Sequence, residues 1–451
     1  MTTTSLPPGP RLPAGVQTLL MLTCGPRFIT ACKRRYGSTF TLQVAGMGTA
    51  VYVTDPADIK TVFAGDPRIF HAGEANSMLK GLLGDTSVLV VDDDLHRDRR
   101  RAMLAPFARD AVTGQAAVMA QVAADNIDGW PVGRTFPAAP KMAEITLEII
   151  LRTVIGASDP VRLAALREVM PRVLSVGPWE TVALANEALL GWRPWHAMRD
   201  AIAEADRLLY DEIADRHADP DLADRSDALS MLVRAGDMTD KELRDQLMTL
   251  LVAGHDTTAT GLSWALERLT RHPAQLARAV RAAREGDDDY LDAVAKETLR
   301  IRPVVFDVGR VLKEAVEIAG HRLPAGVMVI PGMVLVHADS GVYPDADRFD
   351  PDRMIGATLS PSSYLPFGGG NRRCLGATFA MVEFRVVLRE ILRRVELQTT
   401  SARGERRRLK HVIFVPHRGA QIRVTAKRPA DNLVVDDAPS CPVQRPVRGR
   451  V

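Results

Sequence analysis

A single cysteine, Cys374, follows a glycine-rich turn and precedes an apolar helical stretch. It lies in the decapeptide Phe-Gly-Gly-Gly-Asn-Arg-Arg-Cys-Leu-Gly, residues 367–376, and the helical stretch continues to Leu392. A helix N-terminus and adjacent guanidinium groups both stabilise negative charge, so we expect this thiol to be held as thiolate, the form that ligates metals. The glycines let the backbone adopt unusual dihedral angles and leave room for a flat cofactor lying against the loop.

The same segment is also compatible with plainer roles. A free cysteine is often a small buried apolar residue, and a glycine cluster before a helix is often only a turn. A dinucleotide-binding G-x-G-x-x-G loop counted from Gly368 fails, because Arg373 stands where the last glycine belongs. The pattern Phe-Gly-x-Gly-x-Arg-x-Cys-x-Gly resembles the haem-binding loop of the cytochrome P-450 family at every fixed position. This resemblance implies that Cys374 is the axial ligand of the iron in haem b and that Phe367, Gly368 and Gly376 contact the cofactor.

The composition excludes several classes of protein. The 451 residues include 58 basic and 55 acidic side chains, a net charge of +3, so no broad basic surface for nucleic acid is expected. Cys24, Cys32, Cys374 and Cys441 form no C-x-x-C pair, which indicates a reducing compartment without structural zinc. The N-terminus lacks a signal peptide, and its apolar run, residues 16–24, is far shorter than the roughly 20 residues that span a bilayer. We expect a soluble, cytoplasmic monomer with no transmembrane segment.

Helical periodicity dominates the chain from about residue 56 to residue 396. Strand-like runs are fewer, and they cover residues 39–44, 50–54, 327–330, 412–416 and 421–424. These patterns predict a mainly α-helical fold with a minor β-sheet. One domain is expected over residues 1–427, with a small β-region near 39–54 and 321–336 beside a large helical region. Residues 428–451 mix Pro, Asp and Arg without periodicity and are expected to form a disordered tail.

The longest predicted helix begins at a capping box, Thr239-Asp-Lys-Glu242, and continues to about Arg271. Its centre carries Ala253-Gly-His-Asp-Thr-Thr258, and a carboxylate followed by hydroxyl groups is unfavourable inside a buried helix. An acid beside an alcohol suits proton delivery, although a helix irregularity with a solvated Asp256 would also account for the pattern. The segment resembles the distal-helix motif of cytochromes P-450, Ala/Gly-Gly-x-Asp/Glu-Thr-Thr/Ser. The resemblance implies catalytic roles, with Thr257 holding a water beside dioxygen and Asp256 relaying protons from solvent.

Glu297-Thr-Leu-Arg300 places opposite charges on one face of a helix. Such pairs are usually solvated and contribute little to stability. By resemblance this is the Glu-x-x-Arg pair of the cytochrome P-450 family, completed by Arg348 from the segment Pro344-Asp-Ala-Asp-Arg-Phe349. The resemblance assigns Glu297, Arg300 and Arg348 a structural role on the haem side of the core.

His96 and Arg100 lie four residues apart in a basic helical segment, so their side chains project together. A basic segment is most often a solvated helix face. The resemblance implies instead that His96, Arg100, Arg310 and Arg372 bind the haem propionates, because guanidinium groups pair well with carboxylates. Further arginines are expected to stay exposed and to form a basic face for an acidic electron donor, namely Arg97, Arg99 and Arg373.

The family resemblance as a whole implies a soluble bacterial haem-thiolate monooxygenase that inserts one oxygen atom from O2 into a hydrophobic small molecule. Apolar pocket walls are expected from residues 79–90, 184–195, 250–253, 304–308 and 413–414. Electrons would come from NAD(P)H through separate proteins, a ferredoxin and ferredoxin reductase or a flavodoxin-type donor, because the chain shows no fused flavin or iron–sulfur domain. Two alternatives are a peroxide-driven peroxygenase and a non-catalytic haem-binding sensor or carrier. The intact Asp256-Thr257 pair disfavours both.

Overall fold

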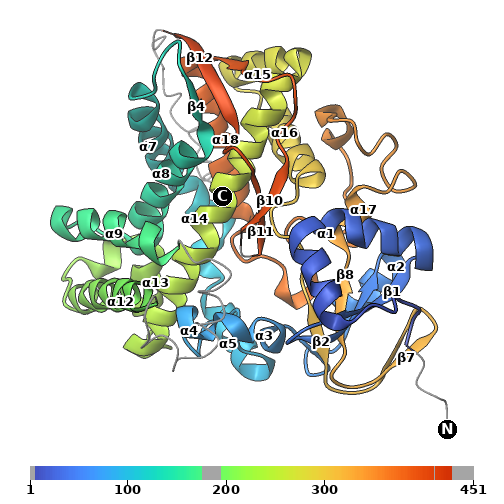
Figure 1. The fold of residues 1–451 in the computed structure, drawn as a ribbon. Coiled ribbons are helices and arrows are strands. Elements are labelled where there is room, and N and C mark those ends of the chain that lie inside the picture. Colours follow the sequence, from blue (N-terminus) through green and yellow to red (C-terminus); the bar gives the residue numbers. More distant parts are fainter. Residues whose placement is uncertain (1–5, 175–194, 411, 429–451) are drawn as a thin grey trace, which may run out of the picture.

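The computed structural model describes residues 6–174, 195–410 and 412–428. Helices make up most of the described chain, and the small sheets lie among them and toward one side (Figure 1). The helices of the first half are α1 (Ala14–Tyr36), α2 (Pro56–Ala64), α3 (Ala72–Ala75), α4 (Lys80–Leu83), α5 (Asp93–Ala102), α6 (Arg109–Gly114), α7 (Ala116–Asp128), α8 (Ala138–Ile150), α9 (Pro160–Val173) and α12 (His196–His217). Those of the second half are α13 (Ala228–Ala235), α14 (Asp240–Arg271), α15 (Pro273–Glu285), α16 (Asp288–Ile301), α17 (Met333–His337) and α18 (Ala377–Arg394).

The largest sheet has five strands in the order β1-β2-β8-β5-β3. Its strands are β1 (Thr39–Val44), β2 (Gly48–Val53), β3 (Phe70–His71), β5 (Arg310–Leu312) and β8 (Met328–Pro331). The two strands predicted at residues 39–44 and 50–54 are confirmed, and they form a hairpin, because β1 pairs with β2 in antiparallel register, with Thr39 opposite Val53. β8 then adds in parallel to β2. The long connection therefore brings Arg310, at the start of β5, into the same sheet as the N-terminal hairpin.

The remaining strands form three smaller sheets. They are β4 (Thr135–Pro137), β12 (Gln421–Lys427) and β9 (Val395–Thr399) in one sheet, the hairpin β10 (Arg407–Lys410) and β11 (Ile413–Pro416), and the hairpin β6 (Val316–Ile318) and β7 (His321–Leu323). The strands expected near 412–416 and 421–424 are confirmed as β11 and β12. Short strands such as β3 and β4 were not predicted, since two or three residues carry no readable periodicity.

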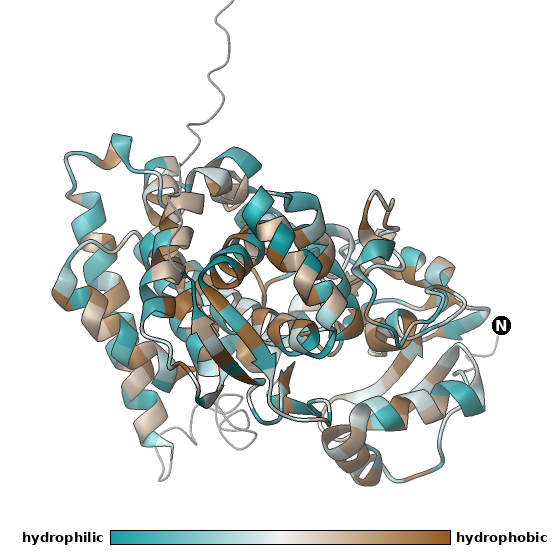
Figure 2. Cartoon of the chain, turned by 90° about the horizontal axis from the view of Figure 1, so that it is seen from above, coloured by the Kyte–Doolittle hydropathy of each residue, from teal (hydrophilic) through white to brown (hydrophobic). Residues whose placement is uncertain are grey.

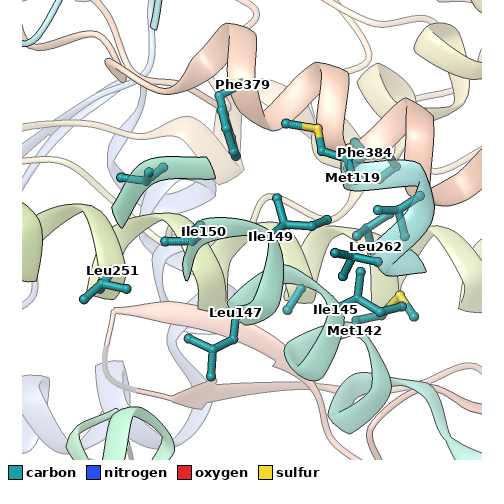
Figure 3. Close-up of a cluster of buried hydrophobic side chains, with 14 of the residues drawn as sticks. Met119, Met142, Ile145, Leu147, Ile149, Ile150, Leu251, Leu262, Phe379 and Phe384 are labelled. Atoms are coloured by element: carbon teal, nitrogen blue, oxygen red, sulfur yellow. The ribbon is translucent and has the colours of Figure 1, made fainter. Parts of the chain in front are cut away.

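α14 is the central helix of the fold (Figure 1). It begins after Thr239, whose side chain and the Glu242 side chain form the predicted capping box, and it runs for 32 residues. Most of its residues are buried, and it packs against α8 and α18 through apolar side chains (Figure 3). Leu251 and Leu262 of α14 lie in one cluster with Ile149 of α8 and Phe384 of α18. The apolar periodicity of the long segment therefore reflects a helix surrounded by other elements.

The peripheral helices show polar and apolar segments alternating along their length (Figure 2), as helices that cover a core from one side must. α1 is longer than the predicted apolar run and is kinked at Cys24, two residues before Pro26. Within the described ranges, none of the helices combines the length and the apolar character needed to cross a bilayer. The predicted tail at 428–451 falls outside the described residues except for Arg428, as does the predicted pocket wall at 184–195 except for Trp195.

Candidate functional site

The loop before α18 folds tightly around Cys374. The Cys374 N–H donates to the Phe367 carbonyl at 2.9 Å, which closes the loop, and Gly368 and Gly370 have φ angles of +65° and +66°. A Cβ at Gly370 would lie 2.1 Å from the Phe63 carbonyl oxygen, so a larger residue cannot occupy this position. Left-handed backbone at both positions and close approach at Gly370 account for Gly368 and Gly370.

Part of the Cys374 residue is exposed, although many protein atoms lie around its thiol. Burial raises the pKa of the Cys374 thiol, and the Gly376 N–H and the Arg100 and Arg373 guanidinium groups oppose that rise without cancelling it. The sequence predicts that a helix N-terminus and arginines hold this thiol as thiolate; in the structure α18 begins only at Ala377, and burial of the thiol opposes the charged form. A bound metal ion would deprotonate such a thiol outright.

α14 packs against α18, the helix that follows this cysteine. A Cβ at Gly261 would lie 3.0 Å from the Phe384 ring, so the two helices are in tight contact there. One turn earlier in α14, the Thr258 hydroxyl lies beside the carboxyl group of Glu383. Cys374 precedes α18 in the chain, on the N-terminal side of these contacts. On the N-terminal side of the same contacts in α14 lies Ala253, which is exposed although most of the helix is buried.

Glu383 is a buried acid that the sequence analysis missed. Its side chain is fully buried, and neither carboxyl oxygen has a hydrogen-bond partner within the described residues. Burial raises its pKa well above the usual range, and the nearby Thr258 hydroxyl, which donates to the Gly254 carbonyl at 3.1 Å, opposes that rise. An acid within the apolar stretch 375–392 was the available sequence signal. Glu383 is thus a buried carboxyl group next to the middle of α14, and its environment disfavours the charged form.

Asp256 and Thr257 lie at the centre of α14 with different partners. The Thr257 hydroxyl donates to the Ala253 carbonyl at 2.7 Å, which leaves its lone pairs free to accept a hydrogen bond. The Asp256 carboxylate accepts from Lys410 Nζ at 2.8 Å, and the two side chains are 18% and 33% exposed. No sequence pattern pointed to Lys410, because β10 is 154 residues further along the chain. The pair connects the centre of α14 with a side chain that reaches solvent.

His96, Arg100, Arg310 and Arg372 come together, and this group of three arginines and one histidine is here called the cation cluster. His96 and Arg310 are only 4% and 5% exposed. Burial, with the charges of Arg372 and Arg100, lowers the pKa of His96 to about 3, and burial with Arg372 lowers the pKa of Arg310 to about 10. Only one acid, Asp92, opposes these charges at both groups. The four residues that were expected to bind propionates are therefore brought together.

The members of the cation cluster differ in their hydrogen bonds. Arg372 donates to Asp92 at 2.5 Å and to the carbonyls of Val91 and Val88 at 2.7 and 3.2 Å. Arg310 donates only to the carbonyl of its own neighbour, Gly309, at 2.9 Å. The side chains of Arg100 and His96 form no hydrogen bond or ion pair with a described residue. Buried cationic donors with so few partners fit a cofactor that carries two carboxylates beside the cysteine loop.

Asp92 organises the other side of this cluster and was not singled out from the sequence. Besides Arg372, it accepts from three backbone N–H groups at the start of α3, those of Ala72, Gly73 and Glu74, at 3.0, 2.8 and 2.8 Å. It therefore ties the cysteine loop to the segment between α4 and α5. The run Asp92-Asp-Asp94 marked only a turn in the sequence, and nothing local distinguished the first acid from the others.

Glu297 and Arg300 form a fully buried bidentate ion pair, with N–O distances of 2.7 and 2.8 Å. The third member is Arg353, whose Nε lies 3.2 Å from Glu297 Oε1. The prediction of Arg348 is wrong: its side chain is 64% exposed and faces Asp350, and only its backbone carbonyl accepts from Arg300. The Arg348 side chain extends into solvent although the next residue, Phe349, is buried, and η5 (Pro351–Met354) then brings Arg353 to the carboxylate.

A buried histidine links this ion pair to the cysteine loop. Arg300 donates to the His337 carbonyl at 2.7 Å, and the Leu365 N–H donates to His337 Nε2 at 2.9 Å. Burial, with the Arg300 charge, lowers the pKa of His337 to about 3, so the ring is neutral and can accept. Since Leu365 directly precedes the loop of Cys374, the Glu297 pair positions the site through this chain of contacts.

The three arginines expected on an exposed basic face do not behave alike. Arg97 and Arg373 are exposed, as predicted. Arg99 is largely buried and forms an ion pair with Glu242 in the capping box of α14. The prediction for Arg99 is therefore wrong, because the side chain fixes α5 to the start of α14.

Further apolar side chains belong to the same core as α14. Leu79, Leu89 and Val305 are partly buried against this core, and Ile413 is buried within it. Phe414 contacts the edge of the Phe306 ring at a centroid distance of 5.0 Å. These residues belong to the segments from which pocket walls were expected.

Comparison with known proteins agrees with this arrangement. The family model for cytochrome P450 matches residues 7–424. A Mycobacterium tuberculosis (strain ATCC 25618 / H37Rv) protein provisionally named cytochrome P450 135B1 is 70% identical over 453 residues, covering 98% of this chain and 96% of the relative. A second protein of that strain, provisionally named cytochrome P450 135A1, is 39% identical over 97% of this chain and 99% of its own length.

Solved structures give the same fold. The retinoic acid-bound cyanobacterial CYP120A1 matches with a TM-score of 0.81 at 22% identity, covering 94% of this chain and 100% of that chain. At that identity the match establishes the fold alone, which is mainly helical with small sheets. The match of the family model across nearly the whole described chain, together with the extensive identity to the mycobacterial relatives, shows that this chain belongs to the cytochrome P450 family, whose members are in general haem-thiolate monooxygenases.

Proposed function

We propose that the protein inserts one oxygen atom from O2 into a hydrophobic small molecule. Electrons would come from NAD(P)H through a separate ferredoxin and ferredoxin reductase, or through a flavodoxin-type donor. The observation that carries this proposal is the acid–alcohol pair at the centre of α14, where Thr257 has a free acceptor and Asp256 reaches toward solvent through Lys410. Simple ligand binding needs no such pair, whereas oxygen activation consumes protons.

The cofactor proposed is haem b. Cys374 would ligate its iron, and the cation cluster would bind its propionates, with Phe367, Gly368 and Gly376 bordering the ring. When bound, haem supplies an iron centre that accepts electrons one at a time and activates dioxygen. Because these residues come from distant parts of the chain, we assign residues 1–427 to one haem domain.

The residues of α14 would divide the work of proton delivery. Thr257 Oγ1 donates to Ala253 and can accept from a water molecule, which fixes that water on the open side of the helix. Asp256 Oδ2 would exchange protons with solvent when Lys410 Nζ releases it. The apolar side chains around α14 would exclude bulk water and favour an apolar substrate.

Oxygenation with labelled dioxygen tests the reaction class. Protein purified with haem, a reductase and a ferredoxin should give product that carries one labelled oxygen atom. Turnover with peroxide alone would indicate a peroxygenase. No labelled product with any compound that binds the reduced or oxidised protein would favour a sensor or carrier.

Paired substitutions test the assigned residues. Thr257→Ala should keep the spectrum of the reduced carbon monoxide complex but release most reducing equivalents as peroxide. Ser263→Ala is the matched control, because it removes a hydroxyl with the same bond to a preceding carbonyl, at 2.7 Å. Cys374→Ser should abolish the thiolate-type spectrum, while Cys24→Ser should not. Unchanged coupling in Thr257→Ala would contradict the role of that hydroxyl.

A further inference from the structure

Exposed apolar side chains are concentrated at the N-terminal end of the described chain. Six of the thirteen large hydrophobic side chains that are exposed in the described residues fall between residues 6 and 47. They are Leu6, Leu12, Val16, Leu19, Leu22 and Met47. Leu19 and Leu22 are 59% and 58% exposed, more than any other leucine in this group. Single exposed leucines are ordinary, but a local group of them marks an interaction surface.

Five of these side chains form one patch, which we call the apolar patch: Leu12, Val16, Leu19, Leu22 and Met47. Val16, Leu19 and Leu22 recur at intervals of three and so share a face of α1. Backbone contacts hold the rest against this helix. The buried Gln17 donates to the Leu12 carbonyl at 2.7 Å, and Thr18 Oγ1 accepts from Ala45 N in the turn that carries Met47, at 2.8 Å. The patch is therefore a fixed surface of the fold.

The charged residues that lie near the apolar patch along the sequence are all basic. The first 54 residues contain five basic side chains and no acid, whereas the remaining chain holds the other 53 basic and all 55 acidic residues. Beyond the kink of α1, a surface groove of about 650 Å³ is lined by Pro26, Arg27, Thr30, Ala31, Arg34 and Arg35. None of its three arginines forms an ion pair with a described residue, while the neighbouring Lys33 is paired with Asp339 at 2.6 Å.

We propose that α1 docks this face of the protein onto the surface of a bilayer that contains anionic phospholipids. The apolar patch enters the boundary between headgroups and acyl chains, and the arginine groove binds lipid phosphates. α1 does not cross the bilayer, since its second half is basic. An apolar face followed by a basic segment, with no acid nearby in sequence, is the charge pattern that complements such a surface.

Vesicle flotation with the full-length, haem-loaded protein tests this proposal. We expect binding to vesicles of equal parts phosphatidylglycerol and phosphatidylcholine, and much weaker binding to phosphatidylcholine alone or in high salt. Arg27→Gln/Arg34→Gln/Arg35→Gln should lower the affinity for the anionic vesicles roughly 100-fold. Leu19→Glu/Leu22→Glu should abolish binding. The matched control is Val161→Glu, which changes a side chain that is 78% exposed at the start of α9, on the opposite side of the molecule (Figure 1).

The outcomes separate the occupants of this face. Absence of wild-type binding to the anionic vesicles overturns the proposal, and so does equal binding by the Leu19→Glu/Leu22→Glu variant. Sedimentation without lipid tests a second copy of the chain: a dimer that the same variant dissociates would assign the patch to self-association and also overturn the proposal. The comparison of vesicle compositions needs no variant, so a folding defect would not decide the result. None of these measurements depends on oxygenation.

Discussion

The Glu297 network and the cation cluster are both buried groups of arginines near the cysteine loop, but they use their hydrogen-bond donors differently. Arg300 donates to both carboxylate oxygens of Glu297 and to two backbone carbonyls. In the cation cluster, Arg310 has one carbonyl partner, and Arg100 has none among the described residues. One network is satisfied within the protein, whereas the other leaves charged donors without partners.

This difference separates structure from function within a single fold. A buried charge is costly unless it is paired, so a protein retains unpaired buried cations only where a bound group compensates them. The satisfied network should therefore support folding, and the unsatisfied one should support binding of an anionic group. Substitutions in the two clusters are expected to separate these properties.

The largest effect is expected from Glu297→Gln. The change leaves Arg300 buried without its charge partner, which should lower the free energy of unfolding by about 3–5 kcal/mol. Thermal or denaturant unfolding of the purified protein measures this loss. Glu74→Gln is the control, since Glu74 forms an exposed pair with Lys313 at 2.9 Å and should contribute less than about 1 kcal/mol. Equal stability of the Glu297 variant and the wild type would contradict the structural role.

A matched pair of arginines tests the corrected third member of this network. Arg353 lies against Glu297, whereas the Arg348 side chain is exposed. Arg353→Gln should therefore destabilise the protein measurably, and Arg348→Gln should stay within about 0.5 kcal/mol of the wild type. A larger loss of stability in Arg348→Gln than in Arg353→Gln would instead support Arg348 as the third member, as expected from the sequence.

The opposite behaviour is expected from Arg310→Gln. Removing a buried charge that has a single carbonyl partner should leave the stability of the haem-free protein unchanged or slightly higher. Haem affinity should fall roughly 10- to 100-fold, the value of a hydrogen bond to a charged group. Hemin titration measures the affinity, Arg310→Lys should restore part of it, and the exposed Arg68→Gln serves as control. A large loss of stability with normal haem affinity would place Arg310 in the structural class.

Local sequence patterns predicted the parts of this molecule that local physics determines. The capping box of Thr239 and Glu242, the hairpin at residues 39–53 and the glycine loop of Cys374 depend on neighbours in sequence, and all three are found in the structure. The family resemblance supplied the grouping of His96, Arg100, Arg310 and Arg372, because no periodicity relates residues that lie more than 200 positions apart.

Contacts between distant segments could not be predicted from sequence. Lys410 reaches Asp256 across 154 positions, and Arg353 replaces Arg348 because of the direction in which one short turn leaves the core. Burial also raises the pKa of the Cys374 thiol against the nearby positive charges, which no local sequence pattern indicated. In each of these cases the deciding factor was tertiary packing, which propensity and spacing do not encode.

The smallest effect concerns the pH dependence of the Glu297 network through His337. Burial lowers the pKa of His337 to about 3 in the folded protein, below its ordinary value of 6.5. As the pH falls below 6.5, the unfolded chain therefore takes up a proton that the folded chain does not, and stability is lost between pH 6.5 and about 3. At pH 5.5 this loss is about 1.4 kcal/mol for one histidine.

His337→Gln should remove that part of the pH dependence, because the amide oxygen can still accept from the Leu365 N–H but cannot titrate. Urea unfolding at pH 7.5 and 5.5 gives the difference between variant and wild type directly. The control is His417→Gln, which makes the same replacement at an exposed histidine. A wild-type slope in the His337 variant would mean that this ring takes up a proton in the folded protein, and that Arg300 does not keep it neutral.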